Sequence, residues 1–275
     1  MSRDENTERE VLAALNTTER VAYRVGRALN ETEPGKRFSS LWGTYLSVPI
    51  LGLTIRNRLH LEGAEHIPKR SVIIAANHRT WFDLYATLIS TWSYYEDTPF
   101  LYCPVRSGFF YEKPMGVVMN VGVSGNAMYP PVFRDERGPV LNRHAVDVCV
   151  RLLAWSPRVV IAMHPEGTRN PSDDPYSFLP GKTGIGRIAL RAQAPVLPVF
   201  VNGLPRSFKR LVQDRLDPKS VPVRVLMGAP VALDDLYHRA DDSAAWREAT
   251  DRIMGGIAER AARDREFMNE RGRGG

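Results

Sequence analysis

Residues 71–83 read SVIIAANHRTWFD, an apolar run followed directly by polar and aromatic residues. Its first half, residues 71–76, is a mostly apolar run with the length of a buried strand. Its second half is polar and aromatic and leads straight into a helical pattern. A buried strand that passes directly into a helix is typical of parallel sheets covered by helices.

The same pattern is found along the chain from Leu59 onward, where short apolar runs alternate with helical patterns. The sequence therefore predicts an α/β fold with a mostly parallel central sheet flanked by helices. The predicted strands are residues 59–62, 71–76, 100–105, 158–163, 196–201 and 223–227. The predicted helices are residues 81–92, 141–155, 184–192 and 243–269.

Two further segments precede the sheet. Apolar side chains recur at helical spacing over residues 6–30, which predicts an amphipathic helix that Glu33-Pro34-Gly35 ends. Residues 41–55 form an apolar run with two aromatic residues, Trp42 and Tyr45, and basic flanks. The run is shorter than the roughly 20 residues of a spanning helix. It favours a segment that dips into one leaflet, with an ordinary core helix as the alternative.

These patterns divide the chain into three parts. Residues 1–56 are expected to form a helical membrane-associating element, residues 57–270 the α/β domain, and residues 271–275 a disordered Arg/Gly tail. A chain of 275 residues with 43% hydrophobic and 25% charged residues suits one such domain with an appendage.

The charge and the cysteine content indicate which partners and which cellular compartment to expect. The net charge of +6 favours acidic partners such as anionic lipid, coenzyme A or acyl carrier protein. No nucleic-acid-binding signature accompanies the charge, so no nucleic acid partner is expected. Two cysteines, Cys103 and Cys149, are too few for a disulfide framework, and the acidic N-terminus lacks the form of a secretory signal. The sequence thus predicts a cytoplasmic protein.

His78 lies where the strand of residues 71–76 ends, which is the edge at which α/β sheets bind ligands. In a regular helix, residues five apart are about 140° out of phase. Asp83 therefore reaches the ring of His78 only if the chain turns at His78. The carboxylate would then hold one ring nitrogen protonated and leave the other free to accept a proton. An accidental structural pair is the alternative, and no Gly-x-Ser-x-Gly motif supplies a serine nucleophile.

A second polar cluster follows the strand of residues 158–163. Arg169 in this cluster is a planar cation suited to phosphate, Gly167 allows close backbone approach, and Glu166 is expected to fix the arginine or the loop. Lys182, further along the chain, precedes a predicted helix and offers another cation. A solvent-exposed Glu-Arg pair in a turn is the alternative. The residues concerned are Glu166, Gly167, Thr168, Arg169 and Lys182.

Four blocks of the chain resemble the PlsC-like glycerolipid acyltransferases, the 1-acylglycerol-3-phosphate acyltransferase family. Residues 77–83, preceded by the LEGAEHIP stretch of residues 61–68, resemble the first block, and residues 165–169 resemble the third. Residues 182–184 are similar to the lysine-containing segment that follows, and residues 194–199 to the fourth block. The order and rough spacings agree from about residue 59 to residue 230.

The resemblance implies that His78 is the general base and that Asp83 orients it, while the cluster of residues 166–169 binds a glycerol phosphate. It implies acyl transfer from a thioester to the free hydroxyl of a lysophosphatidate-type glycerolipid in phospholipid biosynthesis, without an acyl-enzyme. Acyl-CoA or acyl carrier protein would be the co-substrate, with no metal and no other cofactor. The alternatives are glycerol 3-phosphate or another lysolipid as acceptor, a non-catalytic lipid-binding relative, and a metallohydrolase with His164 and Glu166 among its ligands.

The second block departs from the family pattern. The family usually has an acid and an arginine after an apolar strand, whereas this chain has Phe133 and Arg134. Arg134 is the best candidate for a phosphate-binding arginine there, and the departure leaves the identity of the acceptor open.

Some family members carry a two-helix membrane-docking element ahead of the catalytic core, and residues 6–56 resemble it. The chain is therefore expected to be a peripheral or monotopic protein on the cytoplasmic face of a membrane, with membrane lipid as a partner. The sequence leaves the acyl chain length, the choice of donor and the oligomeric state open.

Overall fold

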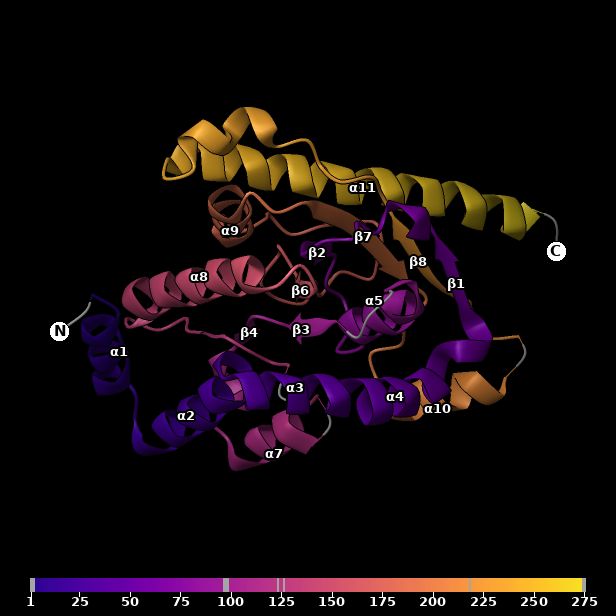
Figure 1. Cartoon of the computed structure of the whole chain (residues 1–275). Helices are drawn as coiled ribbons and strands as arrows, with labels where there is room; N and C mark the ends of the chain where they lie inside the picture. Colours follow the sequence, from indigo (N-terminus) through magenta and orange to yellow (C-terminus); the bar gives the residue numbers. More distant parts are fainter. Residues whose placement is uncertain (1–2, 96–98, 123, 126, 218, 274–275) are drawn as a thin grey trace. The chain divides into compact units, whose positions relative to one another are not determined.

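The computed structural model describes residues 3–95, 99–122, 124–125, 127–217 and 219–273 (Figure 1). The chain forms two compact units. Unit 1 comprises Met1–Ser47 and Thr98–Ile161, and unit 2 comprises Val48–Asp97 and Ala162–Gly275. The expected boundary between residues 56 and 57 falls inside unit 2, and as a domain boundary it stays a prediction.

Unit 2 contains strands β1 (Leu59–Glu62), β8 (Val223–Met227), β7 (Val196–Asn202) and β2 (Val72–Ala76), in that spatial order, followed by the end of β6 (Val159–Met163). β1 pairs with β8 and β2 with β7 in parallel, whereas β7 and β8 are antiparallel. Every residue of β2 and β8 is buried, as continuous apolar runs predict for strands covered on both faces. The mostly parallel sheet is thus confirmed.

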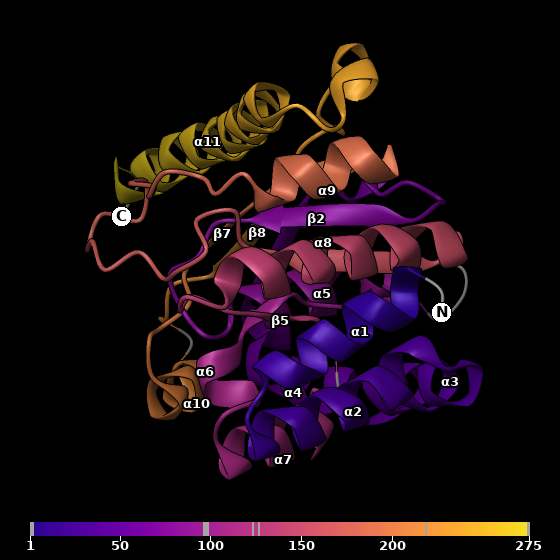
Figure 2. The ribbon, with the colours of Figure 1, turned by 90° about the vertical axis from the view of Figure 1, so that its left-hand side faces the viewer.

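Helices cover both faces of this part of the sheet. α5 (Asp83–Thr91) contacts β2, β7 and β8 from one side. α11 (Ser243–Arg273) contacts the same strands from the other side and packs on α9 (Gly184–Ala192) (Figure 2). α11 continues to Arg273, into the tail that was expected to be disordered, and residues 274–275 lie outside the described residues.

Two more helices of unit 2 lie on the α5 side. α4 (Val48–Ile55) packs on α5 and on α10 (Phe208–Leu216), a helix that the sequence analysis did not predict. Short 3-10 segments complete the unit, namely η2 (Arg56–Arg58), η3 (Ala64–His66), η4 (Trp92–Tyr94) and η5 (Asp234–Arg239).

Unit 1 is mostly helical. Its helices are α1 (Arg3–Ala14), α2 (Thr17–Glu31), α3 (Glu33–Trp42), α6 (Ser107–Phe110), α7 (Pro114–Gly122) and α8 (Gly138–Trp155). β3 (Phe100–Tyr102) pairs in parallel with the first residues of β6, and β4 (Val105–Arg106) pairs with β5 (Pro131–Val132). The single strand expected over residues 100–105 is therefore two short strands.

The prediction of one helix over residues 6–30 is wrong, because the chain breaks between α1 and α2. Asn16 caps α2 by accepting from the backbone N–H of Glu19, whose carboxylate accepts from the N–H of Asn16 in return. The Glu33-Pro34-Gly35 stretch starts a helix rather than ending one. Thr32 caps α3, and Pro34 occupies its first turn, where a missing N–H costs nothing.

One helix among the described residues is long and apolar enough to cross a membrane, judged by length and composition alone. It runs for 23 residues from Glu33 to Ile55 and includes a π-helical turn, η1 (Gly43–Ser47). The turn comes just before Pro49, whose ring and missing N–H disturb the regular ladder. Whether residues 41–55 enter a bilayer stays a prediction.

Candidate active site

His78 follows β2, and its backbone is fixed from two sides. The side-chain amide of buried Asn77 donates to the carbonyl of Val201 at 3.0 Å and accepts from its N–H at 2.7 Å, which extends the pairing of β2 with β7. The N–H of His78 donates to Glu166 Oε1 at 2.8 Å, and its carbonyl accepts from the N–H of Asn170 at 2.7 Å. These bonds hold His78 at the carboxyl end of the strand.

Asp83 begins α5, and its carboxylate is buried. Oδ2 accepts from the backbone N–H of Arg79 at 2.6 Å and of Thr80 at 2.7 Å, and Oδ1 accepts from the Thr80 hydroxyl at 2.7 Å. Oδ2 also lies 3.4 Å from His78 Nδ1. Residues 77–82 precede the helix, so the chain makes the turn that brings Asp83 back to the imidazole.

This pair has the arrangement of a base and its orienting acid. A proton on Nδ1 faces the carboxylate, and Nε2 then keeps a free lone pair. The 3.4 Å separation exceeds the roughly 2.7–3.2 Å of an ordinary N–H···O bond, but catalytic hydrogen bonds commonly tighten as the transition state forms. The His78 side chain is 21% exposed, so its ring reaches solvent while the Asp83 carboxylate does not. Nε2 can therefore accept a proton from a hydroxyl group.

His164, the residue after β6, stacks on His78. The two rings lie 3.8 Å apart between centroids, with their planes 5° from parallel. His164 Nδ1 donates to the carbonyl of Ala76 at 2.9 Å. Burial, together with the adjacent His78 ring, lowers the pKa of His164 to about 3. His164 is thus neutral at pH 7 and places no positive charge against His78 when that ring takes up a proton.

Replacing His164 with phenylalanine should reduce the loss of stability in acid. The unfolded chain protonates His164 near its ordinary pKa of about 6.5, whereas the folded chain does so only near pH 3. The free energy of unfolding therefore falls as the pH drops through this window, by at most about 1.4 kcal/mol per pH unit. His164→Phe keeps the stack but cannot titrate.

Urea unfolding of wild type and His164→Phe at intervals from pH 7 to pH 3 measures this slope. Loss of the bond to Ala76 shifts the whole curve of the variant but does not change its slope. Curves that stay parallel over the whole window would contradict a low pKa of the half-buried His164.

Glu166 joins the two loops of the site. It is buried; Oε1 accepts from the N–H of His78 and Oε2 from the N–H of Leu179, both at 2.8 Å. Burial raises the pKa of Glu166, against these two hydrogen bonds, which lower it. Both oxygens bind the protein's own backbone. Of the two roles expected for Glu166, fixing the arginine or fixing the loop, the contacts match the loop.

Gly167, Thr168 and Arg169 form an exposed turn beside His78. Gly167 has φ of 66°, a left-handed conformation that favours glycine, and its N–H donates to the carbonyl of His164 at 3.0 Å. The guanidinium carbon of Arg169 lies 4.2 Å from the ring centroid of Trp81, in the His78 turn. Such stacking fixes the plane of the guanidinium and leaves its edge donors available for an anion.

The two remaining candidate cations have different surroundings. Lys182 is exposed in unit 2, and its N–H donates to the carbonyl of Pro165 at 2.8 Å, so its backbone is tied to the same turn. Arg134 is exposed just after β5 and belongs to unit 1. A shared site of Arg134 and His78 stays a prediction.

Sequence reasoning missed several contributors to the site. Thr80 carried a signal, because Thr80-x-x-Asp83 before an apolar run has the spacing of a capping box. The stack of His164 on His78 and the contact of Trp81 with Arg169 join residues more than eighty positions apart, and no spacing rule reveals them.

The candidate metal ligands do not assemble into a metal site. Within the described parts of the chain, no group of three or more His, Cys, Asp or Glu side chains is placed to hold a metal ion. His78 and His164 stack in parallel planes, so their ring nitrogens do not converge on one point. Both Glu166 oxygens are engaged by backbone N–H groups.

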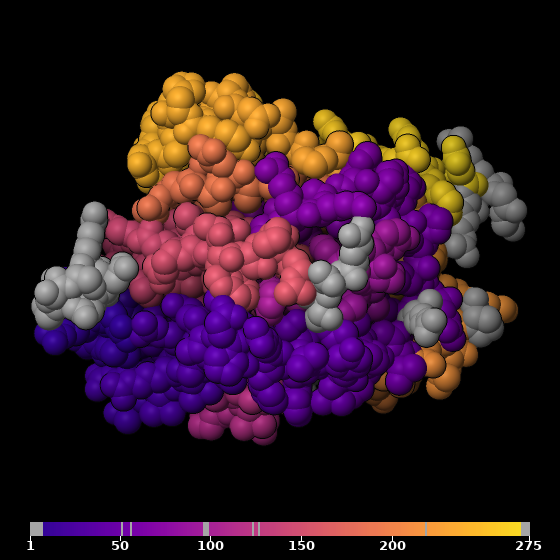
Figure 3. Space-filling view, viewed as in Figure 1, coloured from indigo at the N-terminus to yellow at the C-terminus, as the bar shows by residue number. Residues whose placement is uncertain are grey.

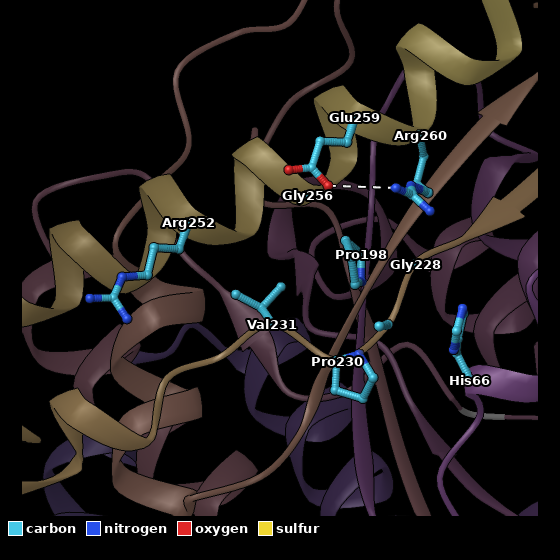
Figure 4. Close-up of a pocket in the computed structure, with 10 residues that line it drawn as sticks. His66, Pro198, Gly228, Pro230, Val231, Arg252, Gly256, Glu259 and Arg260 are labelled. Atoms are coloured by element: carbon cyan, nitrogen blue, oxygen red, sulfur yellow. Dashed lines mark ion pairs between the residues drawn. The ribbon is translucent and has the colours of Figure 1, made fainter.

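A separate cavity of about 330 Å³ lies between α11 and the segment after β8 (Figure 4). Two arginines line it, but each has a carboxylate partner. Arg252 binds Asp235 and Glu248 at 2.6 Å, and Arg260 lies 3.5 Å from Glu259. None of the site residues predicted from the sequence lines this cavity.

Comparison with models of known protein families gives a match. A family model described as Acyltransferase matches residues 58–202, which is more than half of the chain and includes both loops of the site. No curated protein matches the chain.

Proposed function

The chain belongs to the acyltransferase family, and we propose that it transfers a fatty acyl chain from an acyl thioester to the free hydroxyl of a lysophosphatidate-type glycerolipid. The observation that carries this proposal is the His78–Asp83 pair beside the Gly167–Arg169 turn, in one unit. Glu166 joins the two through the N–H of His78. A base for a hydroxyl thus lies next to a cation suited to phosphate.

In the proposed reaction, the acceptor oxygen attacks the thioester carbonyl carbon while its proton passes to His78 Nε2. The tetrahedral intermediate then collapses, the carbon–sulfur bond breaks, and the leaving thiolate takes the proton from His78. No bond to the protein forms. The buried Asp83 carboxylate stabilises the imidazolium of His78. The neighbouring His164 is neutral and therefore does not repel this positive charge. A positioned base of this kind contributes about 10² to 10⁴ in rate.

The exposed cations support a phosphate-bearing acceptor. Arg169 presents a fork that matches two phosphate oxygens, and Lys182 adds a point charge from a segment tied to the same turn. We propose Arg134 as a further phosphate ligand. Acyl-CoA or acyl carrier protein would supply the acyl group, and both are acidic partners for a chain of net charge +6.

Membrane association follows from the same proposal, because both acceptor and product are lipids. The apolar helix from Glu33 to Ile55 supports it, with Tyr45 and Leu53 largely exposed along its length. We propose a peripheral or monotopic protein on the cytoplasmic face of a membrane, acting in phospholipid biosynthesis.

Acyl transfer to a panel of acceptors tests this function. The acceptors are lysophosphatidate, glycerol 3-phosphate and a phosphate-free lysolipid, each with acyl-CoA and with acyl carrier protein as donor. We expect transfer to lysophosphatidate. Preference for another acceptor would change the assigned substrate but leave the proposed acyl-transfer mechanism unchanged. Vesicle binding without turnover of any pair would instead support a non-catalytic lipid-binding protein.

Arg169→Ala should raise the KM for a phosphomonoester acceptor about tenfold or more and change kcat little. A charge-assisted hydrogen bond is worth roughly 1.5–3 kcal/mol, and a contact made equally in ground and transition states affects KM alone. The KM of Arg169→Lys should lie between those of wild type and Arg169→Ala, because lysine keeps the charge but lacks the planar fork of donors. The phosphate-free lysolipid is the control, and an equal rise in its KM would contradict phosphate binding by Arg169.

A further inference from the structure

α10 exposes an apolar stripe. Phe208, Val212 and Leu216 are four residues apart on one face of the helix and are 59%, 38% and 78% exposed. Another face of the helix packs inward through Leu211 and Asp214, both buried. Large apolar side chains spaced in this way normally face a core, so their exposure indicates a surface that something covers.

The neighbouring helix also exposes apolar side chains. α10 packs beside α4, whose Ile50 and Leu53 are 54% and 56% exposed. In the space-filling view, the orange atoms of α10 lie next to the violet atoms of α4 at the lower right (Figure 3). Both helices belong to unit 2.

Cations surround the stripe. Lys209 and Lys219 are exposed, Arg215 is half-buried, and in the described part of the chain none of the three has an ion-pair partner. Arg210 pairs with Asp214 at 2.6 Å, which neutralises the acid on the helix itself. An apolar stripe with uncompensated basic side chains beside it is complementary to a bilayer that carries anionic headgroups.

α10 is also anchored to the candidate active site. Arg206, just before the helix, donates to the carbonyls of Pro171 and Ser172 at 3.0 and 2.9 Å, in the loop that follows Arg169. The Phe208 ring lies 6.3 Å between centroids from that of Phe82, the residue before Asp83. A surface bound through α10 therefore lies close to His78.

We propose that α10 is an interfacial helix, which together with α4 docks unit 2 on an anionic lipid bilayer. Phe208, Val212 and Leu216 enter the boundary between headgroups and acyl chains, and Lys209, Arg215 and Lys219 contact the headgroups. The inference rests on the proposed function, because it gives His78 direct access to an acceptor held in the bilayer.

Site-specific labelling tests the docking without any acyl donor. Leu216→Cys carries an environment-sensitive fluorophore, and Ala258→Cys on α11, exposed on the other side of the sheet, is the matched control. Cys103 and Cys149 are buried and should not react. On phosphatidylcholine vesicles containing phosphatidylglycerol, we expect a blue shift at position 216 and none at position 258.

Vesicle sedimentation measures the strength of the contact. Val212→Ser/Leu216→Ser should weaken binding on the order of 100-fold, about tenfold for each apolar side chain withdrawn. Gln213→Ser, on the same helix but off the stripe, is the control and should bind as wild type does.

Three results would overturn the inference. Vesicles that bind wild type without a spectral change at position 216 would show docking through another surface, and wild type that binds no vesicles would remove the docking altogether. A blue shift that appears without lipid, with a concentration-dependent increase in mass, would assign the stripe to a second copy of the chain. Failure of the proposed function would give a different result. The label at position 216 would still shift on vesicles, but no acyl transfer would be detected.

Discussion

His78→Ala should lower kcat for acyl transfer by about 10² to 10⁴ and leave the fold intact. In the proposed reaction the ring accepts the proton of the acceptor hydroxyl at Nε2, with Nδ1 facing Asp83. The hydrogen bonds that hold this position in place use the backbone N–H and carbonyl of residue 78, which alanine keeps. The measurement is steady-state transfer to lysophosphatidate, with far-UV circular dichroism on the same samples.

His238→Ala is the matched control, because this histidine is exposed and lies outside the site. It should leave kcat unchanged. A His78→Ala protein that is folded and keeps a tenth or more of the wild-type rate would rule out His78 as the base.

Asp83→Asn should reduce both activity and stability. Asparagine has nearly the same shape, but its NH₂ group cannot accept a hydrogen bond from His78 Nδ1–H, so the wrong ring tautomer is favoured and kcat falls on the order of 10³. The same carboxylate accepts from Arg79, Thr80 N–H and the Thr80 hydroxyl. An acceptor lost among these buried donors costs roughly 1–3 kcal/mol of unfolding free energy.

Urea unfolding and steady-state kinetics of Asp83→Asn separate the two effects. Asp235→Asn serves as the control, because Asp235 is a surface acid paired with Arg252. It should leave kcat unchanged and lower the free energy of unfolding by no more than the small contribution of an exposed ion pair. An Asp83→Asn protein that loses stability but keeps full activity would mean that Asp83 only caps the turn and does not orient His78.

The sheet could be predicted closely because its strands are continuous apolar runs. β1, β8 and α9 begin and end at the predicted residues, and β2 and β7 differ from prediction by one residue. α10 escaped prediction because its stripe faces outward, whereas hydrophobic periodicity is read as burial, and its remaining positions are mostly charged. The sequence does not predict α3, because a Pro-Gly pair usually indicates the end of a helix, although the first turn of a helix tolerates proline.

The site was predictable where its parts are close in sequence. The turn from His78 to Asp83 follows from the strand end and from helix geometry, and the structure contains it. The contacts that join the two loops are long-range and leave no local signal. They are the bond of Glu166 to the N–H of His78, the stack of His164 on His78, and the contact of Arg169 with Trp81.

In the proposed mechanism the acceptor's own hydroxyl, activated by His78, attacks the thioester directly. Incubating the protein with acyl-CoA alone, and then with acyl-CoA and lysophosphatidate, tests it by intact-protein mass spectrometry and by release of free thiol. We predict an unmodified protein mass throughout, no thiol release without acceptor, and one thiol released per acyl chain transferred when acceptor is added. A protein that gains the mass of an acyl chain in the absence of acceptor, and passes that chain to lysophosphatidate when it is added, would show transfer through an acyl-enzyme and contradict direct attack.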